Sequence, residues 1–184
     1  MVQLLDVSQS SYFTAFRDLF NETLNALEEA QDIADHLKPL TNHFELLEST
    51  EFDDIKSAFD PMFHSICLTW SHSKHYCRPA RIIVLLQELN NLIIKRAIEF
   101  LEPLDLFKGE PEESLEKIQV CFGIINAYQK SYLAHKSKIK EYFKNGMQVR
   151  EWEFTPKLAF ARLDKFMEKL DNIRVKTIFV FLLV

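Results

Sequence analysis

The sequence has 184 residues, of which 47% are hydrophobic, and a formal net charge of −5. This length fits one domain and its apolar content can fill a sizeable core, whereas the acidic balance disfavours nucleic acid as a partner. Only three glycines occur, so few positions suit tight hairpin turns. Because apolar residues also recur at helical spacing, the sequence predicts an all-α fold.

The sequence gives no sign of export or of a membrane span. The N-terminal stretch MVQLLDVSQS lacks a basic flank and carries Asp6 where a signal peptide has an apolar run. No apolar run approaches the roughly 20 residues that a membrane span needs. The three cysteines, Cys67, Cys77 and Cys121, are an odd number. We therefore expect reduced thiols, in the cytoplasm.

The first helix is expected from Ser11 to about Leu37, where Pro39 disfavours its continuation. Its apolar residues recur every three or four positions and form one stripe. They are Phe13, Phe16, Phe20, Leu24, Leu27 and Ile33. A short helix over 40–50 and a bent connector over 51–59 are predicted to follow.

Proline marks the start of each later helix. Asp60-Pro61 combines a side-chain acceptor at the cap with a proline in the first turn. Pro79 opens the most apolar helix, which we place centrally. Pro111 opens a long helix to about Phe143, and Thr155-Pro156 caps the last one. The prediction is an elongated bundle of about five to six antiparallel helices.

The last ten residues, VKTIFVFLLV, break this pattern because no polar face remains after Thr177. Val, Ile and Phe dominate, so the composition is strand-like. We therefore divide the chain into a helical region, 1–174, and an apolar C-terminal tail, 175–184, which is expected to promote aggregation rather than to serve a function.

The stretch WSHSKHYCRPAR, residues 70–81, is called the joint here. It holds the one metal-like cluster, His72, His75 and Cys77. The two histidines are three residues apart and would share a helix face, but nothing nearby completes a tetrahedral zinc site. A polar helix end with solvent-facing histidines explains the same residues. No GxxxxGK[ST] or GxGxxG loop exists to bind a nucleotide phosphate.

The joint resembles the N-terminal tail of dynein heavy chains, the axonemal ones especially. The resemblance rests on the order and spacing of motifs over about residues 30 to 174. At the joint the matching residues are Trp70, Ser73, Lys74, Tyr76, Pro79, Ala80 and Arg81. The segment LKPLTNHFELLEST precedes them, and Leu85, Glu88, Asn91 and Ile94 follow. Later matches are Trp152, Phe154, Phe160, Arg162, Phe166, Leu170 and Ile173.

This resemblance implies a non-catalytic structural and assembly module of the dynein stem, in a microtubule-based motor complex. Its implied partners are other dynein heavy chains and intermediate or light chains, with no cofactor, nucleic acid, membrane or direct microtubule contact. The implied location is the cytoplasm and cytoskeleton, in the axoneme of a cilium or flagellum. The ATPase ring lies elsewhere in such chains, which agrees with the missing phosphate loop. The segment 175–184 does not resemble the helical continuation of the family. We therefore expect a short fragment or a truncated product of such a chain, with a C-terminal tail of non-family sequence.

The joint is read as structural: Trp70 and Tyr76 hold two helices together, and Pro79 restarts the chain. Arg81 is expected to bond the free carbonyls at the end of the preceding helix. Two other readings stay open. One is an independent helical adaptor that binds partner helices. The other is a metal-dependent enzyme built on His72, His75 and Cys77.

Overall fold

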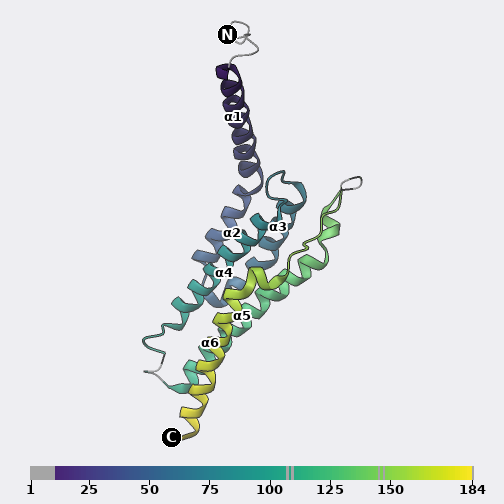
Figure 1. The fold of residues 1–184 in the computed structure, drawn as a ribbon. Helices are drawn as coiled ribbons and strands as arrows, with labels where there is room; N and C mark the ends of the chain where they lie inside the picture. The colour runs from purple at the N-terminus through teal and green to yellow at the C-terminus, as the bar shows by residue number, and fades with distance from the viewer. Residues whose placement is uncertain (1–10, 107, 109, 145, 147, 184) are drawn as a thin grey trace.

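The computed structural model describes residues 11–106, 108, 110–144, 146 and 148–183, without the side chains of residues 11 and 180–183. The expectation about a signal peptide falls on residues 1–10 and lies outside the described residues. The helices are α1 (Ser11–His36), α2 (Lys38–Ser49), α3 (Phe59–His72), α4 (Pro79–Leu101), α5 (Pro111–Ser137) and α6 (Pro156–Leu183), with 3-10 helices at Phe52–Ala58 and Ile139–Tyr142 (Figure 1). The described residues contain no strand, so the all-α prediction is confirmed.

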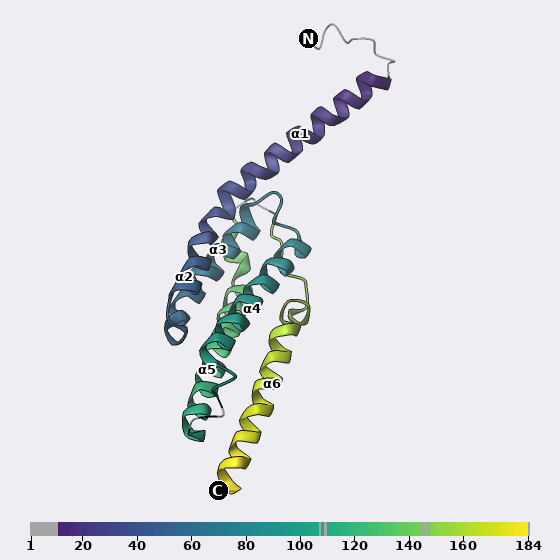
Figure 2. The ribbon, with the colours of Figure 1, turned by 90° about the vertical axis from the view of Figure 1, so that its left-hand side faces the viewer.

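The molecule is elongated, and helices α2 to α6 form its body. Helix α2 follows α1 with a bend between them, and α3 runs back beside α2 (Figures 1 and 2). Helices α4, α5 and α6 then alternate in direction along the long axis. In the body α4 packs against α6, and α5 packs against both α3 and α6. The expected elongated antiparallel bundle is therefore confirmed.

Pro79, Pro111 and Pro156 mark helix starts, as predicted, and Pro39, which was expected only to end the first helix, also lies near the start of the next one. Pro39 and Pro79 each lie in the first turn of their helix, where the missing N–H leaves no intrahelical hydrogen bond unmade. Pro111 begins α5 and Pro156 begins α6. At Leu37, α1 therefore gives way to α2, whose first turn contains Pro39.

Two predicted helix boundaries were wrong. Helix α3 begins at Phe59, with Ala58 at its cap and no side-chain cap. Asp60 instead accepts a hydrogen bond from the Ser131 hydroxyl of α5, so this carboxylate joins two helices rather than capping one. The long helix ends at Ser137 and the chain continues as a short 3-10 helix.

The core contains a cluster of aromatic side chains from α3, α5, α6 and the segment before α6. The side chain of Trp70 is only 2% exposed and meets Trp152 edge to face at 6.5 Å between ring centroids. Tyr132 stacks on Trp152 at 5.5 Å and meets Phe160 at 4.7 Å. The prediction that the Trp70 side chain is buried at the joint is confirmed.

The strand-like reading of residues 175–184 was wrong, because α6 continues through this segment to Leu183. Residue 184 lies outside the described residues. Thr177 is buried, and its hydroxyl donates to the carbonyl of Ile173, four residues earlier in the same helix. Val and Ile cost a helix only about 0.5 kcal/mol each relative to Ala. A helix already formed upstream can therefore extend through them, since elongation is far easier than nucleation.

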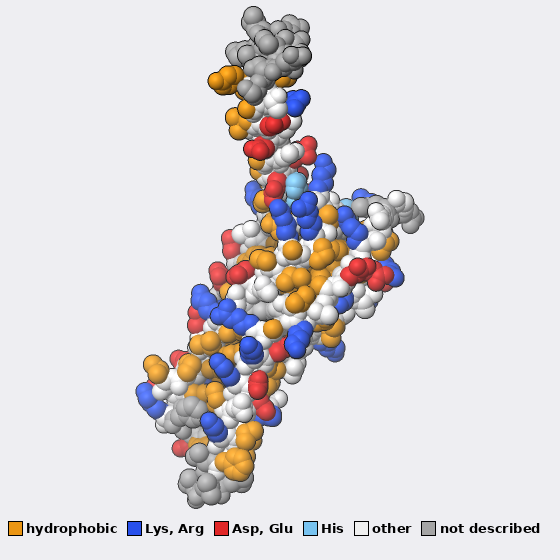
Figure 3. All heavy atoms as spheres, viewed as in Figure 1, with side chains coloured by type: hydrophobic (Ala, Val, Ile, Leu, Met, Phe, Trp, Pro, Cys, Tyr) orange, Lys and Arg blue, Asp and Glu red, His pale blue; other side chains and the backbone are white. Residues whose placement is uncertain are grey.

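The apolar stripe of α1 is exposed rather than packed. The helix projects from one end of the body, which it contacts through α2 and α3 (Figure 2). Figure 3 shows hydrophobic side chains along its projecting part. The exposed fractions are 53% for Phe16, 61% for Leu19, 54% for Phe20, 44% for Leu24 and 66% for Leu27. Helical spacing correctly identified the stripe, but the body does not cover it.

Candidate functional site

The joint turns the chain between α3 and α4, and Ser73 holds this turn together. Ser73 is buried at the C-terminal cap of α3 in an extended conformation. Its hydroxyl oxygen accepts hydrogen bonds from the backbone N–H groups of His75 at 3.2 Å and Tyr76 at 2.8 Å. A serine side chain thus replaces the backbone bonds that a helix would supply here.

Asp32 of α1 binds this turn from outside. Its carboxylate, 8% exposed, accepts hydrogen bonds from the Ser73 hydroxyl at 2.5 Å and from the backbone N–H groups of Lys74 at 3.1 Å and His75 at 3.0 Å. His36, one turn along α1, lies 3.2 Å from the same carboxylate. We call this set of contacts the Asp32 clasp.

The Asp32 clasp determines the ionisation of its carboxylate. Burial alone raises the pKa of Asp32, because it disfavours the charged form. The hydrogen bonds from Ser73, His75 and Lys74 act in the opposite direction and hold the pKa of Asp32 below its usual value. The carboxylate is therefore ionised at neutral pH, the form in which it accepts most strongly.

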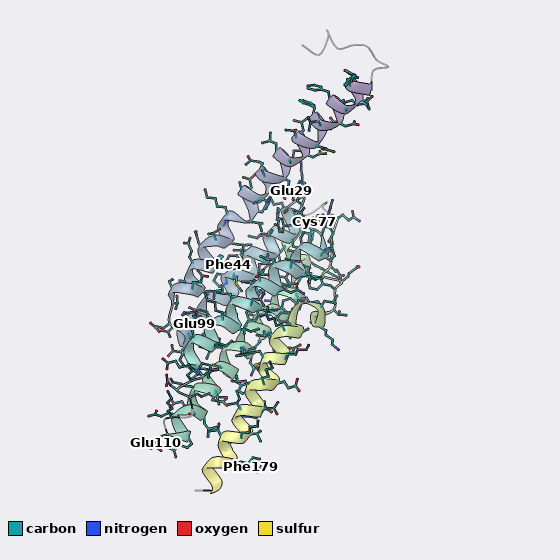
Figure 4. The ribbon with its side chains drawn as sticks, turned by 60° about the vertical axis from the view of Figure 1, so that its left-hand side comes forward. Glu29, Phe44, Cys77, Glu99, Glu110 and Phe179 are labelled. Atoms are coloured by element: carbon teal, nitrogen blue, oxygen red, sulfur yellow. The ribbon has the colours of Figure 1, made fainter. Side chains whose placement is uncertain are left out.

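A second contact with α1 lies on the α4 side of the joint. The guanidinium of Arg81 pairs with Glu29 of α1 at 2.5 Å and lies over the ring of Tyr76, 5.2 Å from its centroid. Its hydrogen bond to Glu29 lowers the pKa of that carboxyl and raises the pKa of Arg81. Lys74 lies 3.9 Å from Glu28. Figure 4 shows Glu29 and Cys77 at this end of the body, where α1 meets it.

The free carbonyls at the end of α3, which Arg81 was expected to bond, accept hydrogen bonds from Arg150 instead. Nη2 of Arg150 lies 3.4 Å from the carbonyl oxygen of Trp70 and 3.3 Å from that of Ser71, and donates to both at the end of α3. In return, the indole N–H of Trp70 donates to the Arg150 carbonyl at 2.8 Å. Arg150 thus satisfies the free carbonyls of α3, whereas Arg81 holds α1.

The remaining residues of the resemblance lie in the core or between α4 and α6. Trp152 and Phe160 belong to the buried aromatic cluster, and Phe166 is partly buried against the core. Glu88 and Arg162 are exposed and both line a shallow cavity between α4 and α6. The residues therefore divide into core contacts, α1 contacts and one surface cavity rather than forming a single site.

The histidines and cysteine of the joint each have a different partner. The ring nitrogen Nδ1 of His72 is 2.7 Å from the Ser71 hydroxyl, Nδ1 of His75 is 4.0 Å from the Glu29 carboxylate, and the thiol of Cys77 donates to the Lys74 carbonyl. Among the residues that the structure describes, no three His, Cys, Asp or Glu side chains gather as metal ligands. Over the same residues, no helix combines the length and apolar character of a membrane span.

Three residues that matter at the joint were not found from the sequence. Asp32 and Glu29 lie among the acidic residues of α1, which resemble a solvated helix face, and nothing in their spacing distinguishes them. Arg150 lies 80 residues from Trp70 in sequence, and only its position just before Trp152 could have drawn attention to it. What the joint can do is mechanical: it fixes the direction of α1 relative to the body.

Comparison with known proteins identifies the family. The family model for "Dynein heavy chain, N-terminal region 1" matches residues 1–179. The chain is 44% identical to Dynein axonemal heavy chain 11 of Sus scrofa over 181 residues, which cover 97% of this chain and 4% of that protein. It is 42% identical to the ciliary Dynein beta chain of Heliocidaris crassispina over 174 residues, 95% of this chain and 4% of that protein.

A human relative shows a similar identity and a similar coverage of both chains. Dynein axonemal heavy chain 9 of Homo sapiens is 42% identical over 173 residues, 94% of this chain and 4% of that protein. The chain thus spans a small part of the length of these relatives. The match to the family model also extends into the segment 175–184, as far as residue 179. The chain belongs to the dynein heavy chain family, as an N-terminal region of the axonemal type.

Proposed function

We propose that this chain is a non-catalytic structural and assembly module in the stem of an axonemal dynein heavy chain. In this role it associates with other heavy chains and with intermediate or light chains, in the axoneme of a cilium or flagellum. The observation that carries the proposal is α1: the joint holds it in a fixed direction while its apolar face remains uncovered. An exposed apolar stripe of this size is typical of a protein interaction surface.

The joint supports this role because it combines buried and charge-assisted contacts. The Asp32 clasp joins α1 to the α3 end of the joint, and the Glu29–Arg81 pair joins it to the α4 end. A fixed helix loses less conformational freedom on binding than a mobile one, so more of the contact energy remains for the partner. Helix α1 therefore acts as a preorganised binding surface rather than as a flexible linker.

A binding experiment tests this function directly. The purified 184-residue chain is mixed with an axonemal dynein intermediate chain and, separately, with the N-terminal region of a different axonemal heavy chain. Complexes are measured by size-exclusion chromatography with light scattering. The expected result is a defined complex with at least one of them, weakened by Leu27→Glu on α1 and unchanged by Leu133→Glu on α5. No complex with either component contradicts the proposal.

The alternative function is an independent helical adaptor that binds partner helices. The exposed face of α1 supports it equally well, so the discriminating observation lies in the gene. A transcript that joins this coding sequence to the rest of a dynein heavy chain supports the stem module. Transcripts that never contain such a continuation, together with binding to proteins outside the dynein complex, support the adaptor.

A further inference from the structure

A polar cavity lies between α4 and α6, which pack side by side in the body (Figure 2). Its volume is about 220 Å³, and four of its lining residues come from the stretch QELNN, residues 87–91. The full set of lining residues is Gln87, Glu88, Asn90, Asn91, Leu158, Ala159, Ala161 and Arg162. We call it the amide cavity, because three of these side chains are amides.

Two of the amides direct their NH2 groups at the backbone of α6. Nε2 of Gln87 donates to the carbonyl of Leu158 at 2.9 Å, and Nδ2 of Asn90 donates to the carbonyl of Ala159 at 2.8 Å. A carbonyl oxygen can only accept a hydrogen bond, so the end of the amide that meets it must be the NH2 group. The amide oxygens of both residues are thereby left as acceptors.

Asn90 carries the clearest sign that a donor belongs in this cavity. Its side chain is only 1% exposed, yet the buried Oδ1 atom has no hydrogen-bond partner in the described part of the chain. Most buried polar side-chain atoms in proteins are paired, because burial of an acceptor without a donor is unfavourable. A donor group bound in the amide cavity beside Asn90 would remove this cost.

The remaining acceptors add a negative charge. Glu88 is exposed and contributes a carboxylate. Nδ2 of Asn91 donates to this carboxylate at 3.4 Å, so the oxygen of the third amide is also left as an acceptor. The amide cavity thus offers three amide oxygens and one carboxylate. A ligand that matches them carries several N–H donors and a positive charge.

We propose that the amide cavity binds the guanidinium group of an arginine side chain from a partner protein. A guanidinium has five N–H donors in a planar fork and no acceptor, whereas a lysine ammonium has three donors. The apolar stem of the arginine can lie on Leu158 and Ala161, which line the cavity and are exposed. The inference deepens the proposed assembly function and rests on it for the source of the arginine.

Arg162 limits the affinity of the amide cavity for a cation. It lines the cavity from α6 and is exposed. Within the described residues it forms no ion pair with Glu88 or with any other carboxylate. It therefore leaves Glu88 unneutralised, while its own charge repels an incoming guanidinium. Removal of the Arg162 side chain should tighten the binding of arginine, whereas it would weaken the binding of an anion.

Nuclear magnetic resonance of the isotope-labelled 184-residue chain tests the proposal with N-acetyl-arginine amide as the probe. We expect saturable shifts of the side-chain amide signals of Gln87, Asn90 and Asn91, with a Kd on the order of millimolar for so small a ligand. The controls are N-acetyl-citrulline amide, which has nearly the same shape without the charge, and N-acetyl-lysine amide. The proposal fails if no saturable shift occurs, or if either control compound binds as tightly as the arginine compound.

Three variants test the cavity residues. Glu88→Gln should raise the Kd of the probe about threefold or more, because it removes the charge and keeps the shape. Asn90→Ala should raise the Kd at least about tenfold, and Arg162→Ala should lower it. The matched control is Glu99→Gln, which removes the same charge from α4 outside the cavity and should leave the Kd unchanged. A Kd that is insensitive to Glu88→Gln, or that rises in Arg162→Ala, overturns the proposal.

Far-ultraviolet circular dichroism shows whether each variant is folded, and the exposed Glu88 decides the outcome if Asn90→Ala does not fold. The source of the arginine is tested in the complex with an intermediate chain or another heavy chain, which Glu88→Gln should weaken. A complex that tolerates Glu88→Gln, while the probe still binds, indicates a free guanidinium compound and refutes the assignment to a partner. Failure of the probe experiment leaves the stem function intact, because that function is tested by complex formation through α1.

Discussion

Replacing Asp32 with alanine should loosen α1 from the joint. The change removes an acceptor of three hydrogen bonds, from the Ser73 hydroxyl and the N–H groups of Lys74 and His75. Hydrogen bonds to a charged group contribute about 1.5–3 kcal/mol each. Water can replace the two backbone contacts in part, because they lie only partly buried. The net cost to docking of α1 should be about 2–4 kcal/mol.

Native-state hydrogen exchange measures this effect where it occurs. In Asp32→Ala the Lys74 and His75 amides should exchange about 30- to 1,000-fold faster, the factor that corresponds to 2–4 kcal/mol. The control is Asp35→Ala, which removes the same charge from the same helix but breaks only a bond to Gln31. Unchanged exchange at Lys74 and His75 in Asp32→Ala would show that the clasp does not hold the joint.

The Asp32 clasp should also respond to acid. The folded-state pKa of Asp32 lies below the unfolded value of about 3.9. The free energy that the Asp32 carboxylate contributes to docking of α1 is therefore fully present above about pH 4. It is lost as the pH falls through the folded-state pKa. Protection of the Lys74 amide should fall in that acid range, and it should fall less steeply in Asp32→Asn, which cannot ionise.

Other variants test the core, a helix, the metal reading and the C-terminal end. Trp70→Ala should lower the free energy of unfolding by about 3–5 kcal/mol in urea, and a loss below about 1 kcal/mol would contradict its core role. Gly123→Ala should stabilise α5 by about 0.5–1 kcal/mol, because the nearest atom to the new methyl group is 3.7 Å away; a lower Tm would refute this. We expect that His72 and His75 bind no metal, so in the variant with both replaced by Gln the Tm should not change on addition of zinc or of a chelator. Stoichiometric zinc in the native chain that is lost in the double variant would contradict this expectation. Deleting 175–184 should raise solubility and remove only the end of α6, as judged by sedimentation and circular dichroism; unfolding of the body would show that the end is needed.

The helix pattern could be predicted from the sequence because proline and apolar spacing act locally. Pro79, Pro111 and Pro156 each begin the helix that they predict. The segment 175–183 shows the limit of local reasoning. Its side chains favour strands when counted alone, but α6 is already formed before them and continues. The composition of a short segment gives only its intrinsic preference for helix or strand. Whether the segment becomes helical depends on whether the turn before it is already helical.

The contacts at the joint could not be predicted, because each joins residues far apart in sequence. Asp32 and Asp35 are both acidic residues on one helix, yet Asp32 is buried in the clasp and Asp35 remains exposed. Only the position of the turn at Ser73 distinguishes them. In the same way, Arg81 was predicted to bond the free carbonyls at the end of α3 because it lies close to them in sequence. Those carbonyls accept hydrogen bonds from Arg150 instead.

The reciprocal contact between Trp70 and Arg150 has a consequence for biosynthesis. The two residues are separated by 80 positions, which a ribosome adds in about 4–16 seconds at roughly 5–20 residues per second. During that interval the end of α3 lacks the partner for its carbonyls, and the indole of Trp70 has no ring from residue 152 to pack against. The nascent chain therefore presents an unfinished aromatic surface at the end of α3 for seconds, until residues 150–152 have been added.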